Sequence, residues 1–188
     1  MVNPDQISRQ LNPDLTSLVF MASFFEFPNP VNEVSARLVA SGVALIGLAC
    51  LVFGQPWLMV VLAGGFLLRV AFGPRVDPLA LVVTRVLTPM LPIPERLTAG
   101  PPKRFAQGIG AFVTVTASLL AFPADMVGWA YGLIAVLVVL ASLEAAIGFC
   151  MGCRMFSLLM RLGVIPASVC EECNDLSLRW ARVGAVAD

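Results

Sequence analysis

Four long apolar segments constrain the fold of this chain more than any other feature. They cover about residues 34–53, 57–72, 106–122 and 127–149, and few charged residues interrupt them. A helix rises about 1.5 Å per residue, so about 20 apolar residues can cross the roughly 30 Å hydrocarbon core of a bilayer. We therefore expect an all-α membrane protein whose four transmembrane helices pack as a bundle.

The composition supports a membrane protein and removes several classes of function. Hydrophobic residues make up 59% of the chain and charged residues 13%, whereas soluble domains average about 45–50% and about 25%. The net charge is zero and Lys103 is the single lysine, so the sequence offers no basic face for nucleic acid. Histidine is absent, which excludes Ser–His and Cys–His nucleophile pairs and His-ligated metal sites.

We divide the chain into three parts. Residues 1–33 form an N-terminal interfacial segment, because the apolar run at 15–27 is too short to span. Residues 34–163 form the four-helix transmembrane domain, and residues 164–188 form an amphipathic cytoplasmic tail. Between the second and third spans, Asp77 is expected to cap a short interfacial helix over about 79–90, and the proline-rich stretch 89–102 is expected to be an irregular linker.

The distribution of basic residues predicts the orientation. The turns at 54–56 and 123–126 contain none, whereas the central linker and the tail contain most of them: Arg75, Arg85, Arg96, Lys103, Arg104, Arg154, Arg161, Arg179 and Arg182. Basic loops stay on the cytoplasmic side of a membrane. We therefore expect both termini and the central linker to be cytoplasmic.

Four of the five cysteines form two closely spaced pairs, Cys150-x2-Cys153 and Cys170-x2-Cys173. The predicted topology places both pairs in a reducing compartment, where a stable structural disulfide is disfavoured. Thiol–disulfide or sulfur-relay chemistry is one interpretation, with Cys150 and Cys153 as the better attacking pair because Arg154 favours a thiolate.

Two alternatives for the cysteines stay open. Two CxxC pairs 16 residues apart are typical of zinc sites, so the four thiols could hold a structural zinc ion in a non-enzymatic membrane subunit or scaffold. They could also be packing residues at a helix end. For Cys50, alone in the first span, packing is the favoured interpretation.

Charged residues within the spans are a second candidate site. Glu144 lies inside the fourth span, and a membrane-buried carboxylate marks a functional site by default. We expect it to pair with Arg69, with Arg37 and Glu33 in the same network, either as a proton shuttle for the thiols or as a structural ion pair. A small-solute transporter using Glu144 and Arg69 is a further alternative, which would require oligomerisation.

Three stretches resemble a known family. They are Val31–Glu33, Leu68–Arg75, and Glu144–Cys153 with its Gly-Phe-Cys-x-Gly-Cys pattern. Together they resemble the bacterial membrane family catalogued as domain of unknown function 4395, over about residues 30–175. The resemblance implies a bacterial inner membrane protein that works beside thioredoxin-like or rhodanese-like partners, alone or as a subunit of a larger membrane complex.

Overall fold

The computed structural model describes residues 30–94 and 96–166. The predicted interfacial segment therefore lies almost entirely outside the described residues. The amphipathic tail with Cys170 and Cys173 lies outside them as well.

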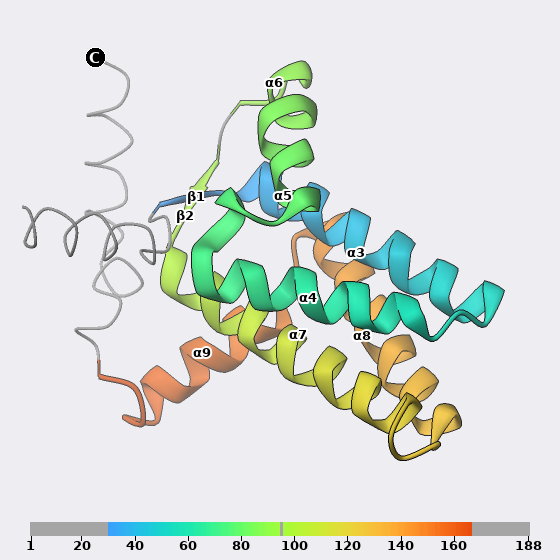
Figure 1. Cartoon of the computed structure of the whole chain (residues 1–188). Coiled ribbons are helices and arrows are strands. Elements are labelled where there is room, and N and C mark those ends of the chain that lie inside the picture. The colour runs from blue at the N-terminus through green and yellow to red at the C-terminus, as the bar shows by residue number, and fades with distance from the viewer. Residues whose placement is uncertain (1–29, 95, 167–188) are drawn as a thin grey trace, which may run out of the picture.

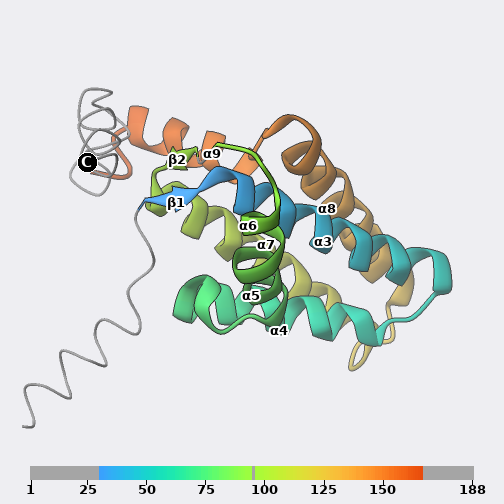
Figure 2. The same cartoon turned by 90° about the horizontal axis from the view of Figure 1, so that it is seen from above.

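The described chain is an all-helical bundle of four long helices, as the sequence predicts (Figure 1). These are α3 (Glu33–Phe53), α4 (Trp57–Phe72), α7 (Gly100–Ala121) and α8 (Val127–Ile147). Helix α3 packs mainly on α8 and α4 mainly on α7, while α7 also packs on α8 and α3 on α4. Successive long helices run in opposite directions, so α3 and α7 begin where α4 and α8 end (Figures 1 and 2). We call this end of the bundle the polar end.

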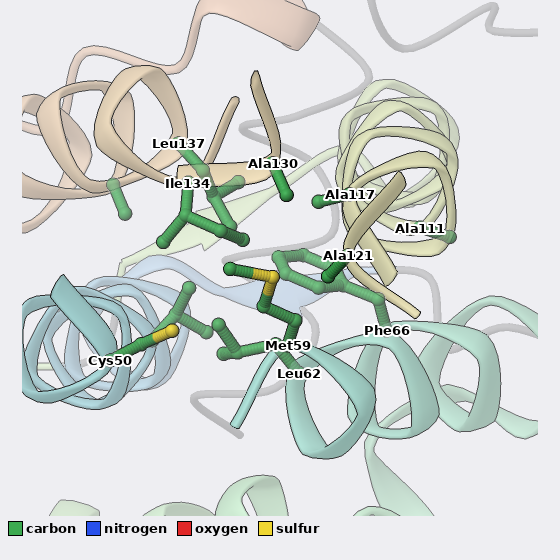
Figure 3. Packing of buried hydrophobic residues seen from close by; sticks show 12 residues of the cluster. Cys50, Met59, Leu62, Phe66, Ala111, Ala117, Ala121, Ala130, Ile134 and Leu137 are labelled. Atoms are coloured by element: carbon green, nitrogen blue, oxygen red, sulfur yellow. The ribbon is translucent and has the colours of Figure 1, made fainter. Parts of the chain in front are cut away.

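Small residues bring the helices together around larger side chains. Met59, Leu62 and Phe66 of α4 fill the centre of the core, opposite alanines of α7 and α8 (Figure 3). Alanine and glycine at such positions let transmembrane helices approach closely. A Cβ atom at Gly110 of α7 would overlap the ring of Phe66, so glycine is required for this contact.

The outer faces of the long helices remain apolar. Their exposed side chains include Leu45, Val52, Val60, Phe112, Trp129, Val136 and Val139. Four helical stretches of the described chain are long and apolar enough to cross a membrane: Glu33–Phe53, Trp57–Met90, Gly100–Ala121 and Val127–Ile147. Because lipid is the solvent that accommodates such faces, the fold is that of a multi-pass membrane protein.

The connection between α4 and α7 is largely helical. It comprises η1 (Gly73–Arg75), α5 (Pro78–Val82), a π-helical turn η2 (Val83–Leu87) and α6 (Thr88–Met90). Ala80 and Val83 of this segment bury against Val39 of α3. The predicted cap is confirmed, because the Asp77 Oδ2 accepts a hydrogen bond from the Ala80 amide at 2.9 Å.

The predicted linker is wrong at its C-terminal end. Helix α7 begins at Gly100, six residues before the predicted span, and it includes Pro101 and Pro102. The first turn of a helix tolerates proline, because its amides have no partner within the helix. Before it, β2 (Leu97–Thr98) pairs antiparallel with β1 (Val31–Asn32), which joins the start of α7 to the start of α3.

A last helix, α9 (Met151–Arg161), follows α8 and packs on α7. It lies at the polar end, next to the strands in Figure 2.

Candidate functional site: a thiol pair beside a buried cavity

The turn between α8 and α9 brings Cys150 and Cys153 together. Helix α8 ends at Gly148, whose φ of 71° is a left-handed conformation that glycine adopts without strain. The chain then turns, and Cys150 becomes the N-cap residue of α9. An N-cap side chain lies over the amide of the third helical residue, which here is Cys153. Both cysteines are free thiols, Cys150 buried and Cys153 half-buried.

Gly152 places this pair against α7. A Cβ atom at Gly152 would lie only 2.5 Å from the Cα of Ala106, so the two helix backbones meet at this point. The rings of Phe105 and Phe156 pack nearby, with centroids 5.6 Å apart. The glycine inside the CxxC motif therefore has a packing role, and Lys103 lies one turn before the contact.

Lys103 is the ion-pair partner of Glu144. Its Nζ lies 2.5 Å from Glu144 Oε1, and the two side chains are 10% and 20% exposed. The predicted Glu144–Arg69 pair is wrong. Lys103 reaches Glu144 because α7 begins earlier than expected, so this lysine belongs to the bundle instead of a linker.

Arg69 has a different carboxylate. Its Nε lies 3.4 Å from the Oδ2 of Asp77, in the turn that follows α4, and both side chains are almost fully buried. The guanidinium also stacks on Phe66 at 4.4 Å and donates to the Gly65 carbonyl at 3.1 Å. Asp77 thus caps α5 and neutralises Arg69 at the same time.

Arg37 and Glu33 lie at the end of α8. Arg37 donates hydrogen bonds to the carbonyls of Ala145 at 3.1 Å and Ala146 at 2.5 Å. The last carbonyls of a helix lack partners within the helix and carry partial negative charge, so a cation stabilises them. The Glu33 carboxylate lies beside Gly148, where a Cβ atom would be 3.0 Å from its Oε1. The expected single network is therefore divided among separate contacts.

The pKa values of the two thiols are shifted in opposite directions. A hydrogen bond from the Cys153 side chain lowers the pKa of Cys150, against the effects of burial and of Glu144, and the Lys103 ammonium lowers it further. The same hydrogen bond and burial raise the pKa of Cys153. These directions favour Cys150 as the thiolate of the pair and Cys153 as the thiol that keeps its proton. Arg154, which the sequence analysis credited with favouring a thiolate, lies over the Phe149 ring at 5.6 Å.

A cavity of about 320 Å³ extends from the thiol pair into the bundle. Most of its wall is aliphatic, and its polar residues are Asn32, Ser35, Arg69, Thr84, Lys103, Gln107, Glu144 and Cys150. The Oε1 atom of Gln107 is buried and has no hydrogen-bond partner within the described chain. Cys150 thus faces a space that contains an unsatisfied acceptor.

Four apolar helices with thiols and buried ion pairs at one end define a multi-pass membrane protein with a largely apolar chamber that contains charged groups. A family model matches residues 31–161, and the chain belongs to that family, described as domain of unknown function (DUF4395). Comparison with curated proteins and with solved structures finds no match.

The described residues hold no group of three or more Cys, Asp or Glu side chains that could bind a metal ion. The zinc alternative needs Cys170 and Cys173, which lie outside them. Two features of the chamber were not predicted from the sequence: the presence of Gln107 and the pairing of Lys103 with Glu144. The sequence does contain a signal that Lys103 belongs to a helix, because the preceding Pro101-Pro102 dipeptide is typical of a helix start.

Proposed function

We propose that this chain is a thiol–disulfide exchange protein of the bacterial inner membrane, with Cys150 as the attacking thiol and Cys153 as the resolving thiol. The observation that carries the proposal is the position of Cys150 at the start of α9, with Cys153 at the third residue of the helix and Lys103 beside both. Helix N-termini and neighbouring cations stabilise thiolates, and the thiolate is the reactive form.

The exchange would proceed through a mixed disulfide. The Cys150 thiolate attacks one sulfur of a disulfide in a thioredoxin-like partner, whose other sulfur leaves as a thiolate and takes up a proton. Cys153 then loses its proton and attacks Cys150 Sγ. The Cys150–Cys153 disulfide forms, and the partner departs as a dithiol that has gained two electrons. Glu144, within the same chamber, is the proposed proton acceptor.

The same thiolate could serve a sulfur relay. In that reaction it attacks the outer sulfur of a persulfide on a rhodanese-like partner, which leaves as a thiolate and transfers one sulfur atom to Cys150. Mass spectrometry distinguishes this product from a mixed disulfide by the added mass of a single sulfur.

Trapping of the intermediate tests the proposal. Full-length Cys153→Ser in lipid nanodiscs, mixed with oxidised thioredoxin, is expected to accumulate a mixed disulfide at Cys150, whereas Cys150→Ser accumulates none at that site. Cys50→Ser is the matched control, because Cys50 is fully buried in α3 and its thiol donates to the Gln55 carbonyl at the other end of the bundle. It should leave trapping unchanged.

Metal analysis of the same preparations tests the alternative of a structural zinc site. One equivalent of bound zinc whose removal unfolds the protein, with no mixed disulfide in Cys153→Ser, would overturn the exchange proposal in favour of a scaffold with a structural metal.

A further inference from the structure

The cavity reaches the surface of the bundle at an apolar place. Three residues of its wall are also largely exposed: Val136 of α8 and Met151 and Met155 of α9. Ile109 and Val113 of α7 line the cavity as well. Val136 lies in the middle of a span, so this opening faces the hydrocarbon layer. A molecule that enters here must be soluble in lipid.

The charges of the chamber select against an anionic ligand. Arg69 is neutralised by Asp77, and Lys103 by Glu144. Phosphate-bearing carriers such as nicotinamide or flavin nucleotides need unpaired cations or free backbone amides around them. The chamber therefore suits an uncharged molecule with a compact polar group, and a volume of about 320 Å³ is enough for one ring with its substituents.

Gln107 supplies the polar contact for such a group. Its buried Oε1 lacks a donor among the described residues. A hydroxyl group on the ligand would satisfy this oxygen, and the amide nitrogen of the same side chain can donate to a carbonyl. A ligand that alternates between carbonyl and hydroxyl forms would be recognised by this one side chain in both states.

We infer that the cavity binds a lipid-soluble quinone, which enters between α7, α8 and α9 and accepts the two electrons of the Cys150–Cys153 pair. This inference rests on the proposed function, because it supplies the electron acceptor for the dithiol. Quinones combine the required properties, since they are uncharged, dissolve in lipid and accept two electrons with two protons.

The reaction balances with the groups present. The Cys150 thiolate adds to the quinone ring and forms a carbon–sulfur bond. Cys153 loses its proton and attacks Cys150 Sγ, which breaks that bond and forms the disulfide. The electron pair stays on the ring, which becomes a quinol with one proton from Cys153 and one from water through Glu144. A thioredoxin-like dithiol then reduces the Cys150–Cys153 disulfide by the reverse of the exchange described under the proposed function, so that electrons flow from the partner through the thiol pair to the quinone.

A pair of variants on one helix tests the route. Val136 is 57% exposed and lines the cavity, whereas Val139 is 59% exposed and does not. Reduced full-length protein in nanodiscs is mixed anaerobically with decylubiquinone. Quinol is followed by ultraviolet absorbance, and the Cys150–Cys153 disulfide by alkylation and mass spectrometry. We expect one quinol per disulfide in the wild type, loss of both products in Val136→Trp, and the wild-type rate in Val139→Trp.

A parallel assay of exchange with oxidised thioredoxin separates the two proposals. All three proteins should exchange at the same rate, which also shows that the variants are folded. If exchange proceeds but the wild type forms no quinol, or if Val139→Trp loses quinol formation as Val136→Trp does, the quinone inference is wrong and the exchange function stands. If neither quinol nor exchange is seen in the wild type, both proposals fail.

Discussion

Lys103 supplies a positive charge that acts on both thiols of the pair. It pairs with Glu144 at 2.5 Å, and its positive charge favours the Cys150 thiolate. Its removal also leaves Glu144 as an uncompensated negative charge, which raises the pKa of Cys150. A side chain 47 positions earlier in the chain therefore contributes to the electrostatics of this cysteine.

Substitution of Lys103 should shift the pH dependence of Cys150 alkylation. In Lys103→Met the pKa of Cys150 rises, so the thiolate fraction and the rate of reaction with iodoacetamide fall at neutral pH. The rates converge with the wild type at a pH above both pKa values. Site-resolved mass spectrometry across a pH series measures this. Lys103→Arg keeps the cation and should retain the wild-type profile, while coincident profiles for Lys103→Met and wild type would exclude the electrostatic role.

Gly152 should tolerate no side chain. Its missing Cβ would meet the backbone of Ala106, so Gly152→Ala forces α9 away from α7. We expect a loss of about 1–3 kcal/mol in the free energy of unfolding, typical of overpacking. Gly108→Ala on α7 is the matched control, because nothing lies within 4 Å of its Cβ. It should gain about 0.5–1 kcal/mol from helix propensity.

Denaturation of both glycine variants in mixed micelles, followed by circular dichroism, compares them. Equal stability of Gly152→Ala and Gly108→Ala would show that the contact with Ala106 does not hold α9 in place.

At the scale of elements, the corner between α4 and α5 depends on a buried ion pair. Arg69 is 3% exposed and is held by Asp77. Asp77→Asn keeps an oxygen that can cap α5 but removes the charge that neutralises Arg69. An unpaired buried charge typically costs about 3–5 kcal/mol, and we expect a loss of this size in thermal unfolding.

Two further variants isolate the charge effect. Arg69→Met combined with Asp77→Asn should recover most of the stability, since no charge is then left unpaired. Asp125→Asn, in the exposed α7–α8 turn at a φ of 51°, should be neutral because asparagine accepts this conformation. A double variant as unstable as Asp77→Asn would contradict the explanation.

The long helices were predictable because their apolar length is a local property of the sequence. Predicted and observed bounds agree for 57–72 and differ by two residues or fewer at the ends of α3 and α8. The start of α7 was not predicted, because proline can end a helix or begin one and Pro101 and Pro102 alone do not distinguish the two. The ion pairs were misassigned because side-chain partners depend on how helices pack, and sequence spacing between Arg69 and Glu144 carries no information about that.

Part of the thiol site was predictable from the sequence. The motif came from spacing and the choice of Cys150 and Cys153 from the neighbouring Arg154, but the N-cap position of Cys150 depends on the left-handed turn at Gly148. The cavity could not be predicted, because it results from side chains of every long helix together.

For the whole molecule, the prediction to test is its orientation in the membrane. The exposed Gln55 lies in the α3–α4 turn, and the exposed Arg161 lies at the end of α9. The positive-inside rule places them on opposite sides of the membrane. In whole cells a membrane-impermeant maleimide should label Gln55→Cys, and it should label Arg161→Cys only after the membranes are opened. The reverse pattern would place the thiols outside and exclude cytosolic partners.

The side opening near Val136 determines which concentration of the ligand controls its binding. A ligand that arrives through the hydrocarbon layer is captured by diffusion in two dimensions, so its mole fraction in the lipid governs occupancy. Adding empty lipid at a fixed amount of protein and quinone should therefore slow quinol formation, although the amounts per volume of buffer stay constant. The rate of thiol exchange with a water-soluble partner should not respond to this dilution.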